Sequence, residues 1–176
     1  IGFIGSSLEN IPQIRPWVFE LKNCSFISIN NVVAVYVNMP VRFEVLIEET
    51  VFDKLSSRFG PAFNFYADDM SKIVITNNTF SNNKALEAGG AIFISNSSSS
   101  DILKNIFFNN AAGDLGGAMI LQNRQNTDAL FKQNTFDNNS AIVGKDIASL
   151  PTKFLTTFIF SNGTSFQVKD SGLQNF

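Results

Sequence analysis

The fold of this chain is decided by three short segments that are nearly alike: Asn78-Thr79-Phe80-Ser81-Asn82-Asn83, Asn105-Ile106-Phe107-Phe108-Asn109-Asn110 and Asn134-Thr135-Phe136-Asp137-Asn138-Asn139. Nine residues past the central Phe, the first two copies continue with Gly89-Gly90-Ala91-Ile92 and Gly116-Gly117-Ala118-Met119. The third copy is one residue shorter there and has the degraded form Gly144-Lys145-Asp146-Ile147. Repetition at a fixed period is the sequence signature of a repeat architecture, so the segments indicate stacked structural units.

The same register extends toward the N-terminus of the chain. The marker Phe recurs with steps of 26, 28, 27 and 29 residues, at Phe26, Phe52, Phe80, Phe107 and Phe136. An Ala marker recurs with steps of 28, 29 and 27 residues, at Ala34, Ala62, Ala91 and Ala118. Two markers that keep one period predict five coils. A sixth, weaker coil is expected through Phe158, Phe160 and Phe166.

Each repeat combines short β-rich runs with turn formers. Lys72-Ile73-Val74-Ile75-Thr76 and Ala91-Ile92-Phe93-Ile94-Ser95 are such runs, whereas Asn109-Asn110 marks a turn. No stretch has sustained helical periodicity with a cap. We therefore predict an all-β fold, a parallel β-helix (a β-solenoid) of five to six coils. Residues 1–176 are expected to form one such domain, with the clearest repeats at 72–149.

Stacked coils place equivalent residues above one another, and this assigns structural roles to the repeated positions. The Phe series predicts an internal aromatic stack. Asn at corners tolerates left-handed backbone angles and forms hydrogen-bond ladders, which we expect of Asn83, Asn110 and Asn139. Sharp corners, where a β-carbon collides or positive φ is required, are expected at Gly89, Gly90, Gly116 and Gly117.

Composition excludes several classes of site. The 176 residues include no His, which excludes Ser-His-Asp and Cys-His catalysis and any His-containing zinc site. Cys24 is the only cysteine, which excludes disulfide frameworks and Cys-only metal sites. A net charge of −2 argues against nucleic-acid binding. No cofactor or metal is therefore expected. Charged residues make up 16 %, and low charge with 21 Asn is typical of secreted and surface proteins.

The FxxN and GGA[ILVM] motifs resemble the repeats of chlamydial polymorphic membrane proteins and of related predicted β-helix surface proteins in ciliates. The matching residues are Phe80–Asn83, Phe107–Asn110, Phe136–Asn139, Gly89–Ile92 and Gly116–Met119. No FxxN precedes Phe80. The resemblance implies a right-handed parallel β-helix, a pectin-lyase-like solenoid, exposed on a cell surface and used for adhesion or as a structural stalk. Because the chain opens at Ile1 without Met, we expect a mature product or, as the preferred alternative, a segment of a longer surface protein.

Five N-glycosylation sequons support an extracellular location. Their acceptor residues are Asn23, Asn77, Asn96, Asn138 and Asn162. We expect Asn96, in a Ser-rich loop, and Asn162, before Gly163, to be the most exposed of them. Asn77 and Asn138 lie beside the repeated Phe and are alternatively ladder residues.

The alternative is a β-helix enzyme that binds or cleaves polysaccharides, which needs carboxylates from adjacent coils and often a basic residue. The candidate carboxylates are Asp68, Asp69, Glu48, Glu49, Asp53 and Asp114. The arginines are Arg15, Arg42, Arg58 and Arg124. None falls one period from a carboxylate pair in a recognisable constellation.

The remaining aromatic residues, Trp17, Tyr36 and Tyr66, are expected to be buried. The sequence thus favours a non-catalytic extracellular structural or adhesion module. Its expected partners are adjacent coils, copies of itself, or host-cell or matrix glycans.

Overall fold

The computed structural model describes residues 1–4, 17–39, 42–67, 71–95, 99–122, 133–150, 154–159 and 165–170. Within these ranges every regular element is a strand, and the strands form five sheets. No helix in the described part of the chain could cross a membrane. The described chain is therefore all-β.

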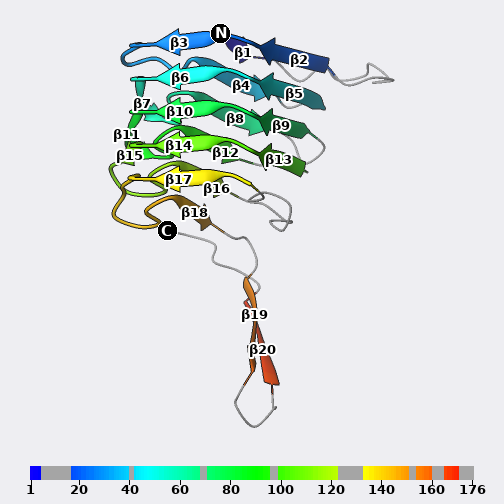
Figure 1. The fold of residues 1–176 in the computed structure, drawn as a ribbon. Coiled ribbons are helices and arrows are strands. Elements are labelled where there is room, and N and C mark those ends of the chain that lie inside the picture. The colour runs from blue at the N-terminus through cyan, green and yellow to red at the C-terminus, as the bar shows by residue number, and fades with distance from the viewer. Residues whose placement is uncertain are drawn as a thin grey trace.

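Four of the sheets run along the molecule and are hydrogen-bonded between coils (Figure 1). The first contains β2 (Trp17–Lys22), β5 (Phe43–Glu48), β9 (Lys72–Thr76) and β13 (Ser99–Leu103). The second contains β3 (Ser25–Ile27), β6 (Val51–Asp53), β10 (Thr79–Ser81), β14 (Ile106–Phe108) and β17 (Thr135–Asp137). The third contains β7 (Ser56–Phe59), β11 (Lys84–Ala88) and β15 (Ala111–Ala112). The fourth contains β1 (Gly2–Ile4), β4 (Val35–Met39), β8 (Phe63–Ala67), β12 (Ile92–Ser95), β16 (Met119–Gln122) and β18 (Ile147–Leu150).

The chain visits these sheets in turn and then repeats the circuit. The strands β5, β6, β7 and β8 form one coil, β9 to β12 the next, and β13 to β16 the one after, with β2 to β4 before them and β17 and β18 after. Every pairing between coils is parallel, as a circuit that always winds the same way requires. About four turns of a parallel β-helix result, which confirms the predicted fold class but is fewer than the predicted five to six coils. Among the described strands, the first circuit has none in the third sheet, and the last contributes only β17 and β18.

The pairing register places the marker Phe residues directly opposite one another. Phe80 is paired with Phe52 on one side and with Phe107 on the other, and the series continues to Phe26 and Phe136. The ring centroids of successive members lie 5.2, 5.0, 4.8 and 5.0 Å apart, and their planes differ by no more than 6°. Neighbouring coils therefore hold the rings in one offset column, as aromatic pairs prefer.

The hydrophobic core lies inside the coils around this column. Phe52, Phe80 and Phe107 are fully buried, as are aliphatic residues of the first and fourth sheets such as Ile75 and Ile92. Short strands with alternating burial, seen in β5 and β9, place every second side chain in this core.

The predicted sixth coil is wrong. Residues of β19 (Phe154–Ile159) and β20 (Ser165–Asp170) pair antiparallel, with Phe158 opposite Phe166. Phe160 lies outside the described residues. Because only residues 160–164 separate the two strands, direct antiparallel pairing is available to them, whereas parallel pairing needs a much longer connection.

Replacing Phe107 by Asp should abolish cooperative folding of the central coils. The substitution buries an unpaired carboxylate between Phe80 and Phe136, at a cost of several kcal/mol. Phe108 follows it in the same strand but is 42 % exposed, so Phe108→Asp is a matched control. Thermal unfolding followed by circular dichroism should show a lost or strongly lowered transition for Phe107→Asp alone. Equal melting of the two variants contradicts the internal stack.

Candidate functional site

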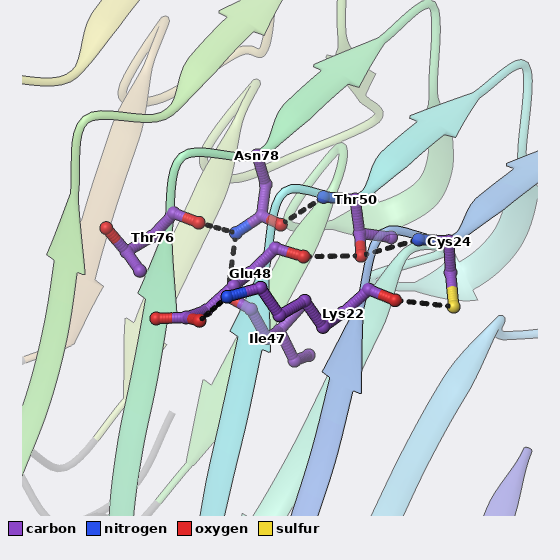
Figure 2. Close-up of polar contacts among 7 residues, drawn as sticks. All are labelled: Lys22, Cys24, Ile47, Glu48, Thr50, Thr76 and Asn78. Carbon is purple, nitrogen blue, oxygen red and sulfur yellow. Dashed lines mark hydrogen bonds and ion pairs between the residues drawn. The ribbon is translucent and has the colours of Figure 1, made fainter.

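A column of polar side chains holds the corner between the first and second sheets. Figure 2 shows its N-terminal part, where Asn78 reaches between two coils. The Oδ1 atom of Asn78 accepts a hydrogen bond from the Thr50 N–H at 2.9 Å, and its Nδ2 donates to the carbonyls of Ile47 and Thr76, each at 2.9 Å. The side chain is 1 % exposed. One buried amide thus satisfies peptide groups of its own coil and of the coil before it.

The same contacts recur one coil further on. The Asn78 N–H and Nδ2 donate to Oδ1 of Asn105 at 2.9 and 3.0 Å, and Asn105 repeats this toward Asn134 at 2.9 and 3.1 Å. Asn105 Nδ2 also donates to the Ile75 carbonyl of the preceding coil. We name Asn78, Asn105 and Asn134 the first inner ladder. These residues open the three repeated segments, but the predicted ladder residues are Asn83, Asn110 and Asn139, with Asn77 and Asn138 as alternatives. The recurring Asn two positions before each marker Phe is the signal that identifies the first inner ladder.

Asn83, Asn110 and Asn139 form a second inner ladder at the next corner. Asn110 Oδ1 accepts from the N–H and Nδ2 of Asn83 at 3.1 and 2.9 Å, while its Nδ2 donates to the Phe80 carbonyl and to Asn139 Oδ1, each at 3.0 Å. All three side chains are at most 1 % exposed. The two inner ladders therefore flank the Phe column, one on each side of the second sheet.

Both inner ladders end at the same coil toward the N-terminus. In the first, the position equivalent to Asn78 is Thr50, whose Oγ1 donates to the Glu48 carbonyl at 2.9 Å and accepts from the Cys24 N–H at 3.4 Å (Figure 2). In the second, Leu55 takes the equivalent position, and its N–H donates to Asn83 Oδ1 at 3.0 Å. The absence of FxxN before Phe80 thus corresponds to coils in which other residues replace the ladder amides.

A third, outer column lies on the surface beside the second inner ladder. Asn138 Nδ2 donates to Asn109 Oδ1 at 3.0 Å, Asn109 Nδ2 to Asn82 Oδ1 at 2.7 Å, and Asn82 Nδ2 to a carboxylate oxygen of Asp53 at 2.7 Å. The bond from Asn82 is the main reason why the pKa of Asp53 lies below its ordinary value. All three Asn residues have φ between 53° and 56°, which Asn tolerates better than most residues. We call Asn82, Asn109 and Asn138 the outer ladder.

The four glycines predicted at corners lie where the third sheet turns into the fourth, and the two members of each pair have different roles. Gly89 and Gly116 have φ of 66° and 64°. Gly90 and Gly117 permit close approach of the next coil. A Cβ on Gly90 would lie 1.8 Å from the Gly117 carbonyl oxygen, and a Cβ on Gly117 would lie 2.0 Å from the Lys145 carbonyl oxygen. A sharp corner therefore needs glycine at both positions.

The candidate carboxylates that the structure describes, Glu48, Glu49, Asp53 and Asp114, are spread over two coils. Glu48 pairs with Lys22 of the neighbouring coil at 3.2 Å, and this hydrogen bond is the main cause of the raised pKa of Lys22. Glu49 occupies an exposed left-handed corner and Asp114 is exposed. Asp68, Asp69, Arg15 and Arg124 lie outside the described residues. Among the described residues, no three of His, Cys, Asp and Glu are grouped closely enough to hold a metal ion.

One shallow groove with a mixed lining crosses the third sheet. It has a volume of about 410 Å³ and is lined by Asn31, Ser56, Ser57, Arg58, Lys84 and Leu86. Arg58 is paired with Glu87 of the next coil and stands over the Phe59 ring, 5.1 Å from its centroid. Arg42, in contrast, is exposed and lies outside this lining. The groove offers hydroxyl, amide and cationic groups beside one apolar side chain.

The expected burial of the remaining aromatic residues is wrong for Trp17. Its side chain is 58 % exposed, because β2 pairs with β5 on one edge alone among the described strands. Tyr36 and Tyr66 are half-buried, with ring centroids 6.3 Å apart and an edge-on arrangement. Burial raises the pKa of the Tyr66 hydroxyl.

The sequon asparagines fall into different environments. Asn23 and Asn77 are exposed at left-handed corners, with φ of 52° and 56°. Asn138 is also exposed but belongs to the outer ladder. Asn96 and Asn162 lie outside the described residues.

Removing one inner-ladder amide should destabilise the chain far more than removing an adjacent outer one. Asn110→Ala leaves the Asn83 N–H, the Asn83 amide and the Phe80 carbonyl without this partner, at about 1–3 kcal/mol for each buried group. We expect a total loss near 3–5 kcal/mol in the free energy of unfolding by urea. The control, Asn109→Ala, alters an exposed position and should cost under about 1 kcal/mol. Similar losses for both variants would refute the ladder's role.

Comparison with known proteins agrees with this geometry. The family model described as a right handed beta helix region matches residues 15–175. No curated protein and no solved structure matches the chain. The matched range includes all four turns and both inner ladders. This chain belongs to the family of right-handed β-helix proteins.

Proposed function

We propose that this chain is a non-catalytic structural or adhesion module of a surface β-helix protein, of the polymorphic membrane protein-like type. It works outside the cell, in a cell-surface or filamentous assembly. One observation carries the proposal: the residues that recur from coil to coil are those of the Phe column, the ladders and the glycine corners, which hold the coils together. The repeated residues therefore build a long, stiff rod.

The ends of the solenoid favour partners that are further coils or copies of the chain. Among the described strands, β3 pairs only with β6, and β17 only with β14, so each leaves one edge of backbone donors and acceptors open. Phe26 and Phe136, the outermost members of the Phe column, are only partly buried. Open strand edges over an apolar column are templates for stacking another coil.

The lateral faces favour contacts with host-cell or matrix glycans. The groove over the third sheet presents Ser56, Ser57 and Asn31 beside Lys84, a lining suited to hydroxyl-rich or acidic sugars. Such binding requires no catalytic constellation. The family contains both enzymes and non-enzymes, so cleavage of a bound polysaccharide is the alternative to be tested.

Two measurements on the same purified full chain separate the classes. Sedimentation over a range of concentrations should reveal elongated particles that associate end to end. Incubation with neutral and acidic polysaccharides should release neither new reducing ends nor unsaturated products, even where binding is detected. Arg58→Ala serves as the control for the groove, because it should weaken sugar binding without altering the inner ladders. A compact monomer that cleaves a polysaccharide, and loses this activity in Arg58→Ala, contradicts the proposal.

A further inference from the structure

One corner of the solenoid turns a single residue outward in every coil. The corner joins the first and second sheets, and its residues are Asn23, Glu49, Asn77, Lys104 and Gln133. Each has a left-handed φ between 49° and 64°, and each is exposed. The residue that follows each of them turns inward: Asn78 and Asn105, for example, are members of the first inner ladder and are 1 % exposed. We call the five outward residues the corner column.

Two members of the corner column are sequon asparagines. Asn23-Cys24-Ser25 and Asn77-Asn78-Thr79 occupy the same place in coils that are two turns apart. Asn23 and Asn77 donate their backbone N–H groups to the carbonyls of Glu48 and Leu103, but among the described residues neither side chain has a hydrogen-bond partner. Thr79 is half-buried and Ser25 exposed at the start of strands in the second sheet. The acceptor amides are therefore free at the surface. The contacts between coils are made instead by the middle residue of each sequon, Asn78 in the first inner ladder and Cys24, whose N–H donates to Thr50 Oγ1.

We infer that Asn23 and Asn77 carry N-linked oligosaccharides, which lie one above the other on the corner column. The inference rests on the proposed extracellular function, because the modification takes place in the secretory pathway. In the transfer, Nδ2 forms a bond to the anomeric carbon of the sugar and loses one proton. The bond from that carbon to the diphosphate of the lipid-linked donor breaks, and the lipid diphosphate leaves. Two coil spacings of about 4.8 Å place the attachment points roughly 10 Å apart.

The third described sequon is an internal contrast. Asn138 Nδ2 donates to Asn109 Oδ1 at 3.0 Å, so this nitrogen is already part of the outer ladder. A sugar attached there removes one N–H and stands directly against Asn109. The geometry therefore assigns glycans to the corner column and not to the outer ladder. Glycans on the corner column leave the groove over the third sheet, with Ser56 and Lys84, open to partners.

The test is site occupancy in the full chain, secreted from a eukaryotic host and confirmed as folded by its cooperative melt. Treatment with peptide-N-glycosidase converts each occupied Asn to Asp, and mass spectrometry of peptides then reports occupancy. We expect Asn23 and Asn77 to be occupied in most molecules and Asn138 in few. Thr79→Ala should remove the glycan of Asn77 alone, whereas the matched control Thr79→Ser should keep it. Ser25→Ala and Ser25→Thr form the same pair for Asn23. An unmodified corner column, or occupancy mainly at Asn138, overturns the inference.

Protein isolated from its natural source separates this inference from the proposed function. Glycans at both Asn23 and Asn77 of the natural protein support the inference and the extracellular location. A second outcome is that the secreted chain carries glycans at Asn23 and Asn77 but the natural protein carries none. The proposed extracellular location is then wrong, and so is the inference that the natural protein is glycosylated. If the natural protein lies on the cell surface with both sites bare, the proposed function stands and the glycan assignment is wrong.

Discussion

The structure depends on one requirement: the peptide groups at each buried corner must find hydrogen-bond partners, and the next coil supplies them. Asn83 Nδ2 donates to the Phe52 carbonyl, Asn110 Nδ2 to that of Phe80 and Asn139 Nδ2 to that of Phe107, each across one coil boundary. A coil by itself leaves these groups unpaired, at a cost of about 1–3 kcal/mol each when they are buried. A single coil is therefore not a stable unit. Stability belongs to pairs of neighbouring coils, as in other solenoids.

This requirement also fixes the remaining regularities of the molecule. From the Phe80 coil onward, an Asn amide meets the same two corners in each coil. This holds the marker Phe residues 27 and 29 residues apart and in one column between the two inner ladders. Many corners take left-handed conformations, at exposed residues such as Asn77 and Glu49 and at Gly89 and Gly116. Gly90 and Gly117 instead permit the close approach of the next coil. Outward residues face no such demand. Recognition of partners is therefore expected on the faces, the corner column and the open ends.

Periodicity made the fold predictable, and its limits explain what was missed. The Phe and Ala markers gave the coil register, because both belong to the buried, strictly repeated set. The first inner ladder was missed although Asn78, Asn105 and Asn134 each stand two residues before a marker Phe, because repetition shows that a residue is aligned between coils but not that its side chain points inward. Phe158 and Phe166 led to the wrong prediction of a sixth coil, since apolar composition does not distinguish a parallel coil from an antiparallel hairpin. The exposure of Trp17 depends on which strands cover β2, and no local pattern encodes that. Surface sites such as the groove need side chains from several coils, so spacing alone could not reveal them.

The most direct test of the central claim is hydrogen exchange of the asparagine side-chain amides, measured by NMR on the folded chain. Buried amides that bridge two coils exchange only when coils separate, whereas surface amides exchange freely. The Nδ2 protons of Asn78, Asn83, Asn105 and Asn110 should be protected many-fold over those of Asn77 and Asn109, and protection should be lost together at the unfolding transition. Equal and rapid exchange at all six positions contradicts the account, because the coils could not then be joined by these ladders.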